Sequence, residues 1–203
     1  MLLQLIPFLT ASILLTLSPG PDIIYVLVQS ISNGKKAGII TTLGLVSGII
    51  IHTSLVAFGV SAIIKASPIL FAIIKIFGAL YLFYLAYKVI KSDSSIAIGE
   101  NTLAKRSRNL FGQGFMMNVL NPKVTIFFLA FFPGFLWEPD GNTIYQFYIL
   151  GFLFMLQALL IFGSVALLAG KISKYLKSHR NSGRILKWTQ IIVFIVIGLL
   201  ILF

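Results

Sequence analysis

Two short stretches carry the residues of this sequence best suited to bind an ionic ligand. Each interrupts an otherwise apolar run, and each combines proline with a polar cap residue and a charge. The residues are Ser18, Pro19, Gly20, Pro21 and Asp22 in the first stretch, and Asn118, Asn121, Pro122 and Lys123 in the second. Proline is tolerated in the first turn of a helix, and Ser and Asn are favoured N-caps. We therefore expect a helix to restart at Ser18-Pro19 and another at Asn121-Pro122.

A restarted helix offers the chemistry of anion binding. Its first N–H groups are unpaired and its dipole is positive there, which suits a carboxylate. Asp22 could meet an ammonium group or carry a proton. Lys123 is unfavourable at a helix start, and a charge at bilayer depth costs about 2.5–3.5 kcal/mol, so it predicts a compensating anion. That anion is the ligand carboxylate or, in the empty state, Asp22. For either stretch alone, a plain proline kink is the alternative.

His52 is the third ionisable group inside an apolar run. Imidazole can gain or lose a proton near neutral pH, so His52 is a candidate for proton coupling together with Asp22. A hydrogen-bonded packing role is an equally valid interpretation. The sequence leaves both open.

The composition indicates an all-α integral membrane protein. Of the 203 residues, 58% are hydrophobic and 10% are charged, and apolar runs long enough to cross a bilayer recur along the chain. The absence of cysteine excludes disulfides and thiolate metal sites. The net charge of +11 does not indicate nucleic acid, because the basic residues cluster in short segments beside apolar runs.

Six transmembrane helices are predicted, and the basic residues set their orientation. The spans are 2–28, 39–64, 68–90, 110–136, 142–170 and 188–203. Thirteen lysines and arginines fall in or beside linkers one, three and five, whereas linker two holds Lys65 and linker four holds Glu138 and Asp140. Basic linkers remain in the cytoplasm, so both termini are predicted outside.

The six spans form one transmembrane domain, 1–203, with two repeats. Repeat one covers about 1–90, a basic linker covers 91–109, and repeat two covers about 110–203. Three spans per repeat invert the second repeat relative to the first. Ser18-Pro19 precedes Asn121-Pro122 by the same 103 residues that separate Gly48 from Gly151. Interruptions in the first span of each repeat, near the midplane, are typical of inverted-repeat transporters. The Gly44-x-x-x-Gly48 spacing also predicts a close helix contact.

The two interrupted spans also carry a family resemblance. "SPGPD" at 18–22, "GLVSGIIIH" at 44–52, "GALYLFYLAYK" at 78–88 and "GFMMNVLNPKVTIFFLAFFPGF" at 114–135 make the whole chain resemble the LysE/RhtB-type amino-acid exporters. The resemblance implies a multi-pass protein of the bacterial cytoplasmic membrane that exports lysine, homoserine, threonine, leucine or similar amino acids. It also implies that export is driven by the proton or potential gradient. The nine residues of the two stretches match the family's motifs and would bind the substrate.

The leading hypothesis is therefore a secondary exporter of amino acids or close derivatives, with no cofactor, in contact with the lipid bilayer. The alternative is an exporter of a divalent metal or small cation. Such a protein would need several carboxylates, thiols or imidazoles near the midplane, and the spans offer only Asp22 and His52. A membrane-embedded enzyme would need a nucleophile–base pair or metal motif, and neither is visible, so the chain is predicted not to be an enzyme. A non-transporting subunit, the substrate's identity and homo-oligomer formation stay open.

Overall fold

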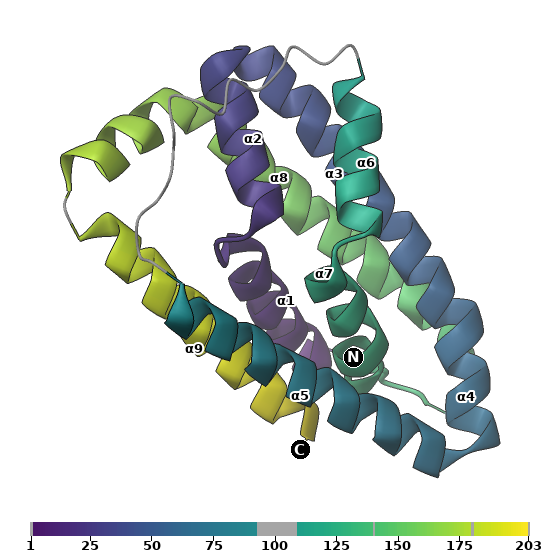
Figure 1. The fold of residues 1–203 in the computed structure, drawn as a ribbon. Helices are drawn as coiled ribbons and strands as arrows, with labels where there is room; N and C mark the ends of the chain where they lie inside the picture. Colours follow the sequence, from purple (N-terminus) through teal and green to yellow (C-terminus); the bar gives the residue numbers. More distant parts are fainter. Residues whose placement is uncertain (1, 93–108, 140, 180, 203) are drawn as a thin grey trace.

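The computed structural model describes residues 2–92, 109–139, 141–179 and 181–202, and this part of the chain is helical throughout, without strands (Figure 1). The α-helices are α1 (Leu2–Leu17), α2 (Pro21–Ser32), α3 (Lys35–Ser54), α4 (Ser61–Ala66), α5 (Pro68–Lys91), α6 (Leu110–Val119), α7 (Pro122–Ile126), α8 (Thr143–Ser178) and α9 (Ser182–Leu202). Two π-helical segments, Leu55–Val60 and Phe127–Phe131, and a 3-10 segment, Phe132–Phe135, continue α3 and α7.

In the described part of the chain, up to six segments are long and apolar enough to cross a membrane, if each bent pair of helices is counted as one span. Four are single helices: Lys35–Ile63, Pro68–Lys91, Thr143–Ser178 and Ser182–Leu202. The other two are bent pairs, in which α1 meets α2 at 55° and α6 meets the segment Pro122–Phe135 at 47°. The predicted all-α, six-span class is thereby confirmed, with a break in the first span of each half of the chain. The inversion of one repeat relative to the other stays a prediction.

Two helix ends differ from the prediction. The fifth span was expected to end at 170 and the sixth to begin at 188, with a polar linker between them. Instead α8 continues to Ser178 and α9 begins at Ser182. Hydropathy reports where a helix leaves the apolar layer, whereas lysine and arginine continue a helix readily, so a basic segment need not be a loop. The predicted basic linker 91–109 lies almost wholly outside the described residues.

Small residues let α3 and α6 cross closely. A Cβ atom on Gly44 would clash with the carbonyl oxygen of Phe111, and one on Gly48 would lie 2.7 Å from Asn118 Oδ1. The close contact predicted from the Gly44–Gly48 spacing is therefore confirmed, with α6 as the neighbouring helix. Because α6 carries Asn118, this crossing also sets the depth of the second break.

Aromatic packing fixes the segment that follows α7. Phe127, Phe128, Phe131 and Phe132 are all buried, and Phe128 and Phe132 stack with their ring centroids 4.2 Å apart. These rings contact one another, and Phe127 and Phe128 also contact Phe154 of α8, so the four rings are part of the packed core. The outward apolar side chains, such as Ile69 and Phe77, are largely exposed, as lipid-facing residues are.

Candidate functional site

The first break consists of residues 18–20, between α1 and α2. The backbone N–H of Ser18 still donates to Leu14 O at 2.9 Å, so Ser18 closes α1 instead of starting α2. The N-cap of α2 is Gly20, with extended backbone (φ −165°, ψ 179°), and Pro21 is its first residue. The restart predicted at Ser18-Pro19 is thus two residues early. A residue that precedes proline is kept out of helical geometry, so Gly20 cannot belong to the helix that Pro21 begins.

The second break consists of residues 120 and 121, between α6 and α7. Asn121 is the N-cap of α7, and its Oδ1 accepts a hydrogen bond from the N–H of Lys123 at 3.0 Å. Pro122 is the first residue of the helix, where its missing N–H costs nothing. Here the helix restarts where the sequence predicts.

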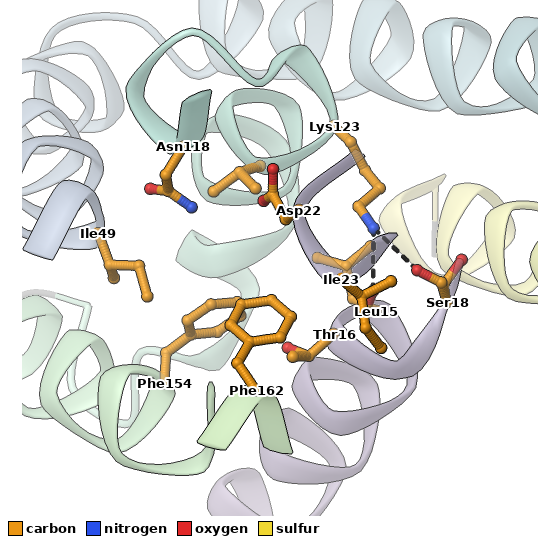
Figure 2. Close-up of a pocket in the computed structure, with 11 residues that line it drawn as sticks. Leu15, Thr16, Ser18, Asp22, Ile23, Ile49, Asn118, Lys123, Phe154 and Phe162 are labelled. Atoms are coloured by element: carbon orange, nitrogen blue, oxygen red, sulfur yellow. Dashed lines mark hydrogen bonds between the residues drawn. The ribbon is translucent and has the colours of Figure 1, made fainter. Parts of the chain in front are cut away.

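The two breaks lie against each other, although about a hundred residues separate them. Asn121 Nδ2 donates to Asp22 Oδ2 at 2.9 Å. Lys123 Nζ donates to Leu15 O at 3.1 Å and to Ser18 O at 3.3 Å, across the gap to the end of α1 (Figure 2). Both ionisable side chains are buried, with 4% of Asp22 and 9% of Lys123 exposed. The structure therefore brings the predicted stretches together as one site.

Lys123 has partners beyond the one expected. The charge of Asp22 interacts with the ammonium group in the empty state, as expected, but the hydrogen bonds of Nζ go to carbonyl oxygens at the end of α1. The last carbonyls of a helix have no partner within it and form the negative end of its dipole. Lys123 therefore caps α1 from a distance, which explains how its charge is tolerated at this depth.

A small cavity lies on one side of Lys123. Its volume is about 20 Å³, and Asp22, Asn118 and Thr16 are among its polar lining residues (Figure 2). Asp22 Oδ1 is buried there without a hydrogen-bond partner among the described residues. A volume of this size holds about one water molecule. The cavity can thus solvate a carboxylate, but it is too small for an amino acid.

A second, wider cavity of about 320 Å³ is also lined by Lys123. Both breaks contribute to its wall through Gly20, Pro21, Asn121, Pro122 and Lys123. The opposite wall comes from α5 and α9, which lie side by side (Figure 1). Pockets for small molecules begin at about 300 Å³, so this cavity has room for one.

His52 is buried beside the second break. Its Nε2 lies 3.0 Å from Asn118 O, which also accepts the N–H of Asn121. Because a carbonyl oxygen only accepts, Nε2 carries the hydrogen in this contact. The hydrogen bond gives His52 a packing role near the site. Whether His52 also carries protons stays a prediction.

Several residues of the site escape sequence reasoning. The amide of Gln157 donates to Thr16 Oγ1 at 3.0 Å beside the small cavity, and Gln190 lines the wide one. Both glutamines lie inside apolar spans, where an uncharged polar group also needs a partner. The sequence signal for both is a glutamine inside a long apolar run.

Two broken membrane spans that meet around buried charges define a membrane protein of the transporter class. The chain belongs to the LysE type translocator family, whose model matches residues 13–203. It is a translocator and not an enzyme, and the predicted family resemblance is confirmed.

Two curated relatives support this assignment. The chain is 29% identical over 174 residues to a homoserine/homoserine lactone efflux protein of Salmonella typhimurium, and the alignment covers 86% of this chain and 84% of the relative. It is 30% identical, with the same coverage, to a homoserine/homoserine lactone efflux protein of Salmonella typhi. No solved structure matches the chain significantly.

Proposed function

We propose that this protein is a secondary transporter that exports small amino acids or close derivatives, such as homoserine, from the bacterial cytoplasm. The observation that carries the proposal is the meeting of two broken spans, with Asn121 bound to Asp22 and Lys123 bound to the end of α1. The two curated homoserine efflux relatives support the choice of substrate class.

The substrate carboxylate binds in the wide cavity, beside Lys123 and the amide of Asn121. Both side chains line that cavity, and a cation with an amide donor suits a carboxylate. To bind there, the carboxylate takes over one of the bonds that Lys123 makes with Leu15 O or Ser18 O. Substrate binding would thus release the end of α1 and couple occupancy to the geometry of the first break.

Asp22 has the proton-coupling role in this proposal. It lines the small cavity, where one carboxylate oxygen accepts no hydrogen bond from the described residues and one water molecule fits. Water beside a buried carboxylate offers a path for a proton, whereas the volume excludes the substrate's amino group. Asp22 and the substrate then act in two different cavities that share Lys123.

The wide cavity disfavours the metal-exporter alternative. Lys88 and Lys123 line it and no carboxylate of the described residues does, so the charge of this lining repels divalent cations. In the described part of the chain, no cluster of three histidine, cysteine or acidic residues could hold a metal ion. An amino acid carries a carboxylate and no excess positive charge, and therefore suits this cavity better.

The orientation follows from the basic linkers. The wide cavity is lined by Lys88, Val89 and Ser92, at the end of α5 that leads into the basic linker 91–109. We expect the basic linkers in the cytoplasm, which puts this end of the cavity on the side from which an exporter takes its substrate. Reporter fusions near residues 35 and 180 should report cytoplasm, and one near residue 140 should report the exterior.

Purified protein in ATP-free vesicles tests the proposed function. Vesicles are loaded with homoserine, threonine, leucine, lysine or a divalent metal ion, and efflux is followed after a proton gradient or a potential is imposed. We expect gradient-dependent efflux of at least one amino acid and none of the metal. Efflux of the metal alone, or strict dependence on added ATP, contradicts the proposal.

A further inference from the structure

The wall of the wide cavity that faces the breaks carries two polar side chains with no assigned role, Gln190 on α9 and Lys88 on α5. The two helices of this wall, α5 and α9, are joined by hydrogen bonds. Lys187 Nζ donates to Ile90 O and to Ser92 O, both at 2.7 Å, and thereby ties the beginning of α9 to the end of α5. The two helices that carry Gln190 and Lys88 are therefore held together at this end of the cavity.

Gln190 is a polar group in need of a partner. It lies eight residues beyond the first residue of α9, which is about 12 Å along the helix at 1.5 Å per residue. No described residue makes a hydrogen bond with its side chain, although the amide has two donors and an acceptor. An unpaired amide within an apolar span is costly, and the cavity that Gln190 lines can supply its partner.

The rest of this wall defines what that partner can be. Leu85, Val89 and Phe194 supply apolar surface between the polar groups. Lys88 adds a positive charge to that of Lys123, and no acidic side chain of the described residues lines the cavity. A cationic substrate side chain gives the substrate a net positive charge and meets repulsion here, whereas a neutral side-chain group that can donate or accept a hydrogen bond meets Gln190.

We infer that Gln190 and Lys88 determine which amino acids are transported: Gln190 hydrogen-bonds a neutral polar group on the substrate side chain, and Lys88 excludes cationic side chains. The inference rests on the proposed function, because it takes the carboxylate of the substrate to lie at Lys123 and Asn121. The preferred substrate class is then amino acids with a short hydroxyl, ester or amide side chain, ahead of isosteric apolar ones and of lysine or arginine.

The first experiment compares efflux of homoserine with that of norvaline, in which a methyl group replaces the hydroxyl. In Gln190→Leu and Gln190→Met, the ratio of kcat/KM for homoserine to that for norvaline should fall about three- to tenfold, the value of one neutral hydrogen bond. Norvaline efflux itself should stay within about twofold. Thr189→Val, at the neighbouring exposed position of α9, serves as the control and should leave the ratio unchanged.

The second experiment addresses charge. Lys88→Gln should increase the efflux of lysine relative to homoserine by about fivefold or more, as expected when one of two repelling charges is removed from a partly hydrated cavity. Lys91→Gln, one turn further along α5 and outside the cavity lining, should not change this selectivity.

The outcomes separate the two proposals. If the wild-type protein exports none of these amino acids, the proposed function is refuted and this inference with it. If the wild type exports homoserine but both ratios are unchanged in the variants, only the inference is refuted. Equal losses of homoserine and norvaline efflux in both Gln190 variants would assign that residue a purely structural role and also overturn it.

Discussion

The two breaks of this protein are built differently, although each follows the same plan of a helix that stops and restarts at a proline. The second break has its own cap, because Asn121 Oδ1 binds the N–H of Lys123. The first break has no side-chain cap, and its N-cap is Gly20. The first break presents oxygens, from Asp22 and the end of α1, and the second presents the donors Asn121 Nδ2 and Lys123 Nζ.

The difference shows that the first break depends on the second. Without Asn121 and Lys123, the Asp22 carboxylate and the last carbonyls of α1 would lack these donors in a buried region. Without Asp22 and the end of α1, by contrast, the second break would retain its own cap and its own helix start. Any ligand that competes for Lys123 therefore perturbs the first break more than the second. The predictions below test this asymmetry, from the largest expected effect to the smallest.

Lys123→Met should have the largest effect. The thioether keeps the length of the side chain but removes both charge-assisted hydrogen bonds to the end of α1, so the protein should be destabilised by about 3–5 kcal/mol. Efflux at matched protein levels should fall at least about tenfold, because the carboxylate loses its cation. Lys91→Met is the control, since Lys91 is exposed. Normal efflux and stability in Lys123→Met would reduce both breaks to plain proline kinks.

Asn121→Ala should rank second, and it separates capping from cross-linking. The variant loses a helix cap, worth about 0.5–2 kcal/mol, and the hydrogen bond to the charged Asp22, worth about 1.5–3 kcal/mol. Asn142→Ala removes only a cap, because Asn142 Oδ1 accepts from the N–H of Tyr145 at an exposed helix start. Thermal unfolding in detergent should show the larger loss for Asn121→Ala. Equal losses would mean that the bond to Asp22 contributes nothing.

Gly48→Ala should disturb the second break indirectly. The added Cβ would lie 2.7 Å from Asn118 Oδ1, so the Asn118 side chain must move, and overpacking of this kind costs about 1–3 kcal/mol. A Cβ on Gly163 of α8 meets nothing within 4 Å. Gly163→Ala should therefore be neutral or stabilising by about 0.5–1 kcal/mol. We expect efflux to fall about twofold or more only in Gly48→Ala, and similar behaviour of the two variants would contradict this.

The contrast between the breaks also shows how far the sequence could predict the site. The occurrence of an interruption in two spans was predictable, because proline and asparagine act locally on the backbone. The exact start of α2 was harder to predict, because either Pro19 or Pro21 could be the first residue of the helix. The hydrogen-bond partners of Lys123 were not predictable, because carbonyl groups belong to every residue and only the tertiary fold, which brings the side chain of Lys123 to the end of α1, selects Leu15 and Ser18. The role of Gln190 depends likewise on a cavity between distant segments.

His52→Gln should have the smallest effect, and it asks whether proton coupling belongs to the first break alone. Glutamine can still donate to Asn118 O, and that oxygen also accepts from the N–H of Asn121, so the second break keeps its geometry. The cost should be about 1 kcal/mol or less, and efflux should stay within about twofold. Glutamine does not titrate, so a profile of efflux against pH that matches the wild type would leave Asp22 as the coupling group. His179→Gln, at the exposed end of α8, is the control. Loss of the pH dependence in His52→Gln but not in His179→Gln would place a proton carrier beside the second break. It would contradict the proposal that proton coupling belongs to the first break alone.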